Sequence, residues 1–285
     1  MKPLRLFLLS LLCALAFGQA PLDNDKVWQD FVGWLKAQHS INDISGDKYR
    51  ASLIQSGLTA AQADERMAVI GKLFPERREQ LGTVFANKLY TSPDQTRFIY
   101  EPNAFLVKTA KSLKPGKALD VAMGQGRNAV FLATQGWDVT GYDLADEGLK
   151  AANDNAAKAG TKIKTINASF DSFDYGKEQW DLIYFIYTDA PIVDSKYVDR
   201  IVAALKPGGY LLIERPFLDL DLPTKDPEWN APLIEQDKPN ALLKAYSSLR
   251  VLEYQDTHEI ADWQQTATDR LKKQVRIVRI LARKG

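Results

Sequence analysis

The segment from Ala118 to Ala129 constrains the fold more than any other part of the sequence; it reads Ala-Leu-Asp-Val-Ala-Met-Gly-Gln-Gly-Arg-Asn-Ala. Its apolar start predicts a buried strand that delivers Asp120, and Gly124 and Gly126 predict a tight turn in which the backbone can approach a ligand closely. A helix follows at once, and the free N–H groups and positive dipole end of its first turn suit an anion. Strand, glycine turn and helix in this order predict a ligand site at the edge of an α/β sheet.

A second acidic residue supports this prediction. Asp143 closes the next predicted strand, where a carboxylate can accept hydrogen bonds from ribose hydroxyls. The run from Gly124 to Ala129 also matches the G-x-G-x-x-A pattern of dinucleotide sites, so an NAD-dependent oxidoreductase is an alternative. Asp120, however, would bring negative charge towards a pyrophosphate, whereas it suits the cationic amine of S-adenosylmethionine (SAM). We therefore expect SAM rather than NAD.

Beyond residue 95, short apolar runs alternate with helical segments, which predicts βαβ units and a parallel sheet. The expected strands are Lys117–Ala122, Trp137–Tyr142, Ile163–Asn167, Trp180–Ile186 and Tyr210–Glu214. The expected helices are Arg127–Gln135, Ala145–Ala159 and Val193–Leu205. Two further β-rich runs, Leu249–Gln255 and Val275–Leu281, predict a closing antiparallel hairpin rather than the second mononucleotide half of a dehydrogenase.

The stretch from Asp23 to Tyr90 has a helical pattern instead. Apolar residues over Val27–Leu35 follow the spacing of an amphipathic helix, with Asp23 or Asn24 as its N-cap. Further helices are expected over Tyr49–Gln55, Thr59–Leu73 and Pro75–Leu89. No chemical motif lies here, so the stretch is interpreted as a packing extension. The alternative, a lid over a pocket, requires polar or aromatic side chains that face the neighbouring domain.

Four segments together resemble class I SAM-dependent methyltransferases. They read Leu-Asp-Val-Ala-Met-Gly-Gln-Gly-Arg-Asn, Gly-Trp-Asp-Val-Thr-Gly-Tyr-Asp, Trp-Asp-Leu-Ile and Leu-Lys-Pro-Gly-Gly-Tyr-Leu-Leu-Ile-Glu. The Gly-Arg-Asn ending is most similar to the tellurite-resistance and thiopurine methyltransferase-like branch. The resemblance covers roughly residues 98 to 284. It implies an α/β fold: a Rossmann-like, seven-stranded, mostly parallel sheet with an antiparallel last strand, here behind an α-helical N-terminal extension.

The resemblance also implies roles for individual residues. The turn Gly124–Gly126, including Gln125, would bind the methionine end of SAM, with Asp120 near the amine and Asp143 on the ribose. The position of the adenine-contacting acid of the family holds Ser169, next to Phe170. Ala122 stands where the family often has glycine, and alanine fits there only if its φ angle stays negative.

The first residues are expected to be a leader rather than part of the fold. Lys2 and Arg5 form a positive head, an apolar run extends from Leu6 to Phe17, and small residues precede Gln19, as in a secretory signal peptide. The only cysteine, Cys13, lies in this run, so the mature chain would hold no thiol. We expect residues 1–18 to be the signal peptide, 19–95 the helical extension and 96–285 the methyltransferase domain. Export to the periplasm or medium would follow; an uncleaved membrane anchor or a cytoplasmic location is the alternative.

Composition narrows the function further. With 37 Lys and Arg against 36 Asp and Glu, the chain lacks the basic excess of a nucleic-acid binder. The two histidines, His39 and His258, have no acidic companions at ligand spacing, so no metal site is expected. We expect a monomer that acts on a small-molecule acceptor, away from membranes unless the leader stays attached.

Methyl transfer from a sulfonium needs alignment more than acid–base chemistry, and no acid–base pair is apparent, so no catalytic residue is assigned. Tyr187, after the strand Trp180–Ile186, is the one substrate-side candidate, because ligands bind at that edge of an open α/β sheet. SAM-dependent methyl transfer to a small molecule is the expected function. A non-catalytic exported nucleoside-binding module of the same fold is the second alternative.

Overall fold

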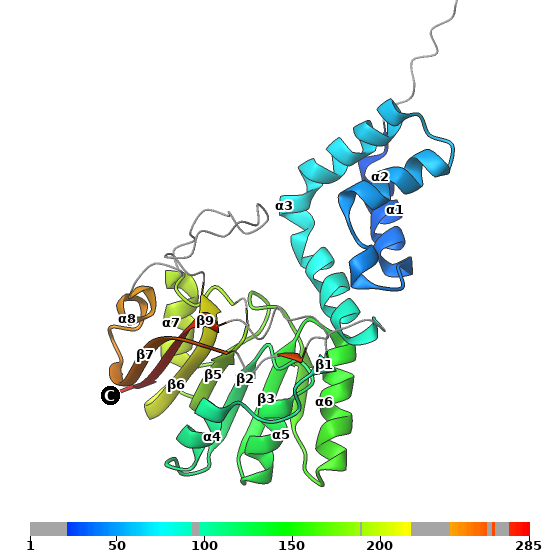
Figure 1. Ribbon diagram of the computed structural model, residues 1–285. Helices are drawn as coiled ribbons and strands as arrows, with labels where there is room; N and C mark the ends of the chain where they lie inside the picture. Colours follow the sequence, from blue (N-terminus) through cyan, green and yellow to red (C-terminus); the bar gives the residue numbers. More distant parts are fainter. Residues whose placement is uncertain (1–21, 93–96, 189, 218–239, 261–263, 266–273) are drawn as a thin grey trace, which may run out of the picture.

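The computed structural model describes residues 22–92, 97–188, 190–217, 240–260, 264–265 and 274–285 of the chain. Within these ranges an α-helical region comes first, and a sheet with flanking helices follows it (Figure 1). This arrangement confirms the predicted fold class. The predicted signal peptide, residues 1–18, lies outside the described residues.

The N-terminal region folds around a core of its own. It contains α1 (Asn24–Ala37), the 3-10 helix η1 (Ile41–Asp43), α2 (Gly46–Gln55) and α3 (Ala60–Thr91). Polar side chains start the three α-helices: Asp23 caps α1, Ser45 caps α2, and Thr59 forms a capping box with Gln62 at α3. Apolar side chains from all three α-helices are buried in one cluster, separate from those of the sheet.

α3 corrects one prediction, because a single helix runs through Pro75 where two helices were expected. Proline has no N–H to donate inside a helix and bends it, and α3 is bent in Figure 1. Packing on both sides of Pro75 holds the halves together. Ile70 and Leu81 are buried in the same cluster, and Trp28 Nε1 donates a hydrogen bond to Gln80 Oε1 at 2.6 Å. Tertiary contacts override the local helix-breaking signal.

Seven strands form the main sheet, in the order β4-β3-β2-β5-β6-β9-β7. Their bounds are β2 Lys117–Val121, β3 Asp138–Asp143, β4 Lys164–Asn167, β5 Trp180–Ile186, β6 Leu205–Phe217, β7 Arg250–Ile260 and β9 Gln274–Arg283. β9 lies between β6 and β7 and is antiparallel to both, which confirms the predicted antiparallel last strand. A separate ribbon pairs β1 (Arg97–Phe98) with β8 (Gln264–Gln265) and was not predicted.

Helices cover both faces of the sheet (Figure 1). Alternation along β5 shows the two faces: Leu182 and Tyr184 pack with α4 (Ala104–Ala110) and α5 (Arg127–Thr134), whereas Ile183 and Phe185 pack with α7 (Ser195–Ala204) and α8 (Ala241–Ala245). The remaining helix, α6 (Asp146–Lys158), follows β3. Helices α5, α6 and α7 lie close to their predicted bounds. Helices α4 and α8 were not expected.

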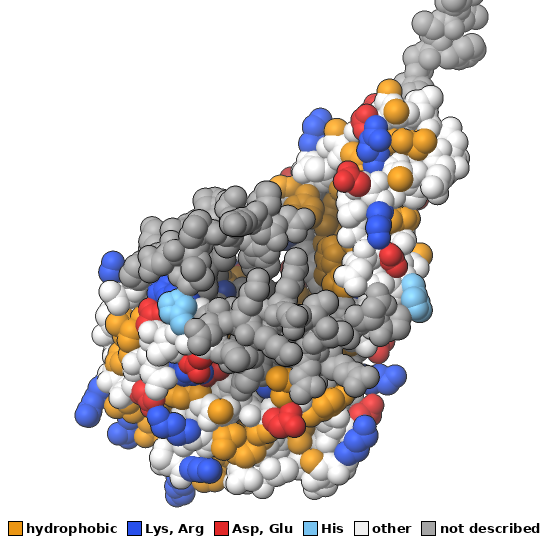
Figure 2. Space-filling model, viewed as in Figure 1, with side chains coloured by type: hydrophobic (Ala, Val, Ile, Leu, Met, Phe, Trp, Pro, Cys, Tyr) orange, Lys and Arg blue, Asp and Glu red, His pale blue; other side chains and the backbone are white. Residues whose placement is uncertain are grey.

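The surface shows no concentration of one charge on the face seen in Figure 2, where Lys and Arg side chains are interspersed with Asp and Glu. This pattern agrees with a formal net charge of +1. Among the described residues, none of the helices combines the length and the apolar character needed to span a bilayer.

Candidate cofactor-binding site

The predicted glycine turn and its acidic partner meet at the carboxyl ends of β2 and β3. Gly124 has a φ angle of 53°, in the left-handed region that favours glycine. Its N–H donates to Asp143 Oδ2 at 2.8 Å, while the N–H of Ala145 donates to Asp143 Oδ1 at 2.8 Å. The carboxylate of Asp143 thus joins the glycine turn to the connection between β3 and α6. Burial raises the pKa of Asp143, and these two N–H groups oppose the shift.

Asp120 is 3% exposed and lies in β2 directly opposite Tyr184 of β5. Burial raises the pKa of its carboxyl to about 8; the hydroxyl of Tyr184 opposes this shift, and the carboxylate of Asp143 adds to it. Its Oδ2 atom is buried and accepts no hydrogen bond of good geometry from any part of the chain that the structure describes. A buried acceptor without a donor is destabilising unless a ligand supplies one.

These features fit SAM. An ammonium group beside Asp120 would supply a well-aligned donor to its Oδ2 and a compensating positive charge. Asp143 presents two oxygens at the same edge of the sheet, where ribose hydroxyls can donate to them. Gly124 lies between the two carboxyls along the chain and permits close approach of a ligand to the backbone.

The other residues of the turn hold the fold together around this site. Gly126 has a φ angle of 76° and caps α5, and a Cβ at this position would lie 2.8 Å from Ala152 Cβ of α6. Gln125 is buried; its Nε2 donates to the carbonyl of Ile99 at 3.2 Å, and its own carbonyl accepts from Asn155 Nδ2 at 3.0 Å. Gly126 therefore permits close packing of α5 on α6, and Gln125 fixes the segment before α4.

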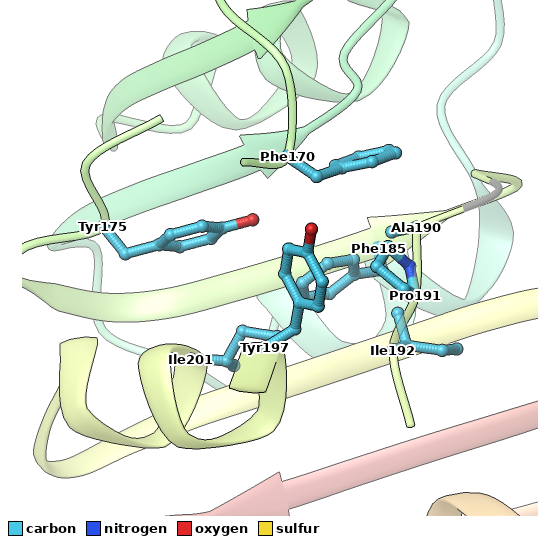
Figure 3. Close-up of a pocket in the computed structure, with 8 residues that line it drawn as sticks. All are labelled: Phe170, Tyr175, Phe185, Ala190, Pro191, Ile192, Tyr197 and Ile201. Atoms are coloured by element: carbon cyan, nitrogen blue, oxygen red, sulfur yellow. The ribbon is translucent and has the colours of Figure 1, made fainter. Parts of the chain in front are cut away.

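The predicted adenine side lies at the end of β4 (Lys164–Asn167). The N–H of Ala168 donates to the carbonyl of Asp143 at 3.1 Å, so this segment lies beside the ribose-side acid. Ser169 is buried, and its Oγ lies 3.0 Å from Ser172 Oγ within a local turn. Phe170 lines a narrow apolar crevice whose other lining residues appear with it in Figure 3: Tyr175, Phe185, Ala190, Pro191, Ile192, Tyr197 and Ile201.

Two residues at the ends of neighbouring strands have strained backbones. Ala122, after β2, has a φ angle of 55°, and Tyr187, after β5, has a φ angle of 54°. The expectation of a negative φ at Ala122 is wrong, because the turn keeps the left-handed geometry without the glycine that would relieve it. Strain of this kind concentrates at functional sites. Arg127 lies over the ring of Tyr187 at 5.9 Å and donates to the carbonyl of Glu101 at 3.0 Å.

A buried ion pair supports this edge of the sheet and was not predicted. Glu214, at 1% exposure in β6, accepts a hydrogen bond from Asn103 Nδ2 at 2.7 Å and pairs with Arg279 of β9. The N–H of Asn103 in turn donates to Asn128 Oδ1 at 2.9 Å. Asn128 thus connects the first turn of α5 to the start of α4.

Tyr90, in the last turn of α3, also lies at the site and was not predicted. A Cβ built on Gly124 would lie 2.5 Å from Tyr90 Oη, so the hydroxyl contacts the glycine turn directly. No local pattern marks this residue, because the contact joins segments far apart in the chain. The lid interpretation of the helical extension had required an aromatic or polar side chain facing the other domain, and Tyr90 is such a side chain.

Comparisons with known proteins agree with this geometry. Residues 118–209 match the methyltransferase domain family. The chain is 28% identical over 155 residues to a probable S-adenosyl-L-methionine-dependent methyltransferase TehB of Haemophilus influenzae, covering 53% of this chain and 52% of the relative. It is 27% identical over 157 residues to Hemagglutinin 1 of Eikenella corrodens, covering 52% and 49%. The chain therefore spans about half the length of these curated relatives.

A solved structure extends the agreement to the fold. The crystal structure of TehB from Haemophilus influenzae superposes with a TM-score of 0.53 at 22% identity, over 64% of this chain and 62% of that one. Seven strands in the observed order and a glycine turn between two acidic residues agree with the matched domain. The chain carries a methyltransferase domain, and it is similar to the SAM-dependent methyltransferase TehB.

Proposed function

We propose that the protein transfers a methyl group from SAM to a small-molecule acceptor. The observation that carries this proposal is the buried Oδ2 of Asp120, which accepts no hydrogen bond of good geometry from the described residues, beside a glycine turn fixed by Asp143. When bound, SAM supplies an electrophilic methyl group on a cationic sulfur. An NAD-dependent oxidoreductase gains no support, because Asp120 would lie close to the pyrophosphate.

The chain contributes binding and alignment. Asp120 receives the amine, Gly124 permits close approach of the methionine portion, and Asp143 holds the ribose. Phe170, next to Ser169 after β4, offers an apolar side chain on the adenine side. Fixing both ends of the cofactor restricts where the methyl group points, and alignment of this kind can contribute about 7–11 kcal/mol to a displacement reaction.

Tyr187 is the residue we place on the acceptor side. It follows β5, which pairs with β2 next to Asp120, and its N–H donates to the carbonyl of Glu214 at 2.9 Å. Arg127 lies over its ring at 5.9 Å. An aromatic face beside a cationic methyl group is favourable, which supports a positioning role for Tyr187.

Calorimetry with SAM, S-adenosylhomocysteine and NAD tests the cofactor assignment. We expect heats of binding with the first two ligands and none with NAD. Asp143→Ala should abolish SAM binding, because it removes the ribose acceptor and the anchor of Gly124. Asp138→Ala is the matched control, since Asp138 is exposed at the opposite end of the same strand. Absence of heat with both adenosyl ligands would overturn the proposal, and micromolar affinity in Asp143→Ala would overturn the ribose assignment.

The cellular location is a separate proposal that rests on residues 1–18. A cleaved leader would export the domain, whereas SAM is made in the cytoplasm. Sequencing the N-terminus of the mature protein, together with cell fractionation, tests export. A mature chain that begins at Gln19 and is recovered outside the cytoplasm supports it, and an intact N-terminus in the membrane or cytoplasmic fraction contradicts it.

A further inference from the structure

The helical extension contacts the cofactor site through the C-terminal part of α3. Asn87 Oδ1 accepts a hydrogen bond from the N–H of Glu147, in the first turn of α6, at 3.0 Å. One turn further along α3, the ring of Tyr90 packs over Gly148, where a built Cβ would lie 2.9 Å from Tyr90 Cε2. Both contacts fall on the first turn of α6, which begins at Asp146, shortly after Asp143. The extension is thus joined to the ribose side of the site.

Tyr90 reaches further, to the centre of the site. Its Oη would lie 2.5 Å from a Cβ on Gly124, and its Cζ would lie 3.6 Å away, so the hydroxyl is in contact with the glycine itself. Gly124, which the hydroxyl contacts, donates its N–H to Asp143 Oδ2 at 2.8 Å, so Tyr90 lies on the part of the turn that the ribose-side acid holds. Burial raises the pKa of Tyr90, and the carboxyls of Asp143 and Asp120 add to the shift.

We propose that Tyr90 gates the cofactor site, because its side chain and the methionine portion of SAM compete for the same space against Gly124. The proposal rests on the proposed function. A ligand held at one end by Asp120 and at the other by Asp143 passes over Gly124, where the hydroxyl of Tyr90 lies. Binding then requires the last turn of α3 to move away from the turn.

With competition of this kind, the apparent dissociation constant equals the intrinsic one divided by the fraction of molecules whose site is open. If Tyr90 occupies the space in about nine molecules of ten, removing its side chain strengthens SAM binding about tenfold. The association rate should rise as well, because fewer encounters meet a closed site. A direct contact between Tyr90 and SAM would have the opposite effect on affinity.

Calorimetry and stopped-flow binding of SAM to the full chain test the gate with Tyr90→Ala and Tyr90→Phe. We expect tighter and faster binding in Tyr90→Ala, and a smaller gain in Tyr90→Phe, which keeps the ring over Gly148. Phe74→Ala is the control, because Phe74 is 51% exposed on the same helix and should leave binding unchanged. Unchanged or weaker binding in Tyr90→Ala overturns the gate alone. Loss of binding in both wild type and variant overturns the proposed function and the gate with it.

Hydrogen exchange on the unsubstituted protein provides a second test that does not depend on the folding of a variant. Saturating SAM should speed amide exchange in residues 84–91, because displacement of Tyr90 loosens the last turns of α3. The amides of α1 serve as the internal reference, since they should exchange at the same rate with and without SAM. Slower or unchanged exchange in residues 84–91 overturns the gate.

Discussion

Asp120 and Tyr184 face each other across the parallel strands β2 and β5, and each carries a buried oxygen with no hydrogen bond of good geometry to the described residues. Burial raises the pKa of both groups, to about 8 for Asp120 and well above its usual value for Tyr184. Two polar groups are thus kept in the centre of the sheet at the cost of their solvation. Because the raised pKa of Asp120 lies near neutral pH, the charge of this carboxyl should change with pH in the physiological range.

SAM binding should release a proton. With a pKa of about 8, the carboxyl of Asp120 is mostly protonated at pH 7, whereas a cationic amine favours the carboxylate. We expect affinity to increase by up to about tenfold between pH 6 and pH 7. Calorimetry in buffers of different ionisation enthalpy should show release of close to one proton. Asp120→Asn should bind weakly and release none; proton release that persists in this variant would contradict the assignment.

The same carboxyl should make the protein less stable as the pH rises. Between about pH 4 and pH 8 the native state holds a proton on Asp120 that the unfolded chain has lost, so the free energy of unfolding falls with rising pH. The slope from this group is at most about 1.4 kcal/mol per pH unit. Urea denaturation from pH 5 to 7.5 should show Asp120→Asn gaining stability relative to wild type across the series. A constant difference would show that the pKa of Asp120 is not raised.

Local sequence was sufficient to predict a strand that is buried over most of its length. The strand Trp180–Ile186 matches its predicted bounds, because the apolar run that follows Asp181 is buried and allows few alternatives. The glycine turn was predicted for a similar reason, since Gly124 and Gly126 both need positive φ angles. Asp120 and Asp143 could be predicted as site residues because they lie at or near the ends of predicted strands.

Features that depend on distant contacts could not be predicted in this way. Pro75 reads as a helix boundary, and only packing of α3 against α1 keeps the helix continuous. Tyr90 has no motif around it, and its role depends on how α3 meets the start of α6. The two-residue pairing of β1 with β8 is too short to leave a periodic pattern.

Breaking the buried ion pair at the end of β6 should destabilise the fold. Arg279, whose side chain is 14% exposed, pairs with two carboxylates, Glu214 and Glu259. Glu214→Gln removes the first of these two partners. We expect a loss of about 2–3 kcal/mol in the free energy of unfolding, measured by urea denaturation. Lys26→Ala, which removes a pair with Asp30 on the surface, is the control and should leave the midpoint unchanged. A similarly small change in the free energy of unfolding in both variants would show that the Glu214–Arg279 pair does not stabilise the fold.

Gly126 should tolerate alanine far less well than Gly136 does. Both have positive φ angles, 76° and 89°, so both substitutions carry a backbone penalty of about 1 kcal/mol. A Cβ on Gly126 also meets Ala152 Cβ at 2.8 Å, whereas nothing lies within 4 Å at Gly136. We expect Gly126→Ala to cost about 2–4 kcal/mol by urea denaturation, and Ala152→Gly in the same chain to recover the steric part. Equal losses at both glycines, or no recovery in the double variant, would show that contact with α6 does not require glycine at position 126.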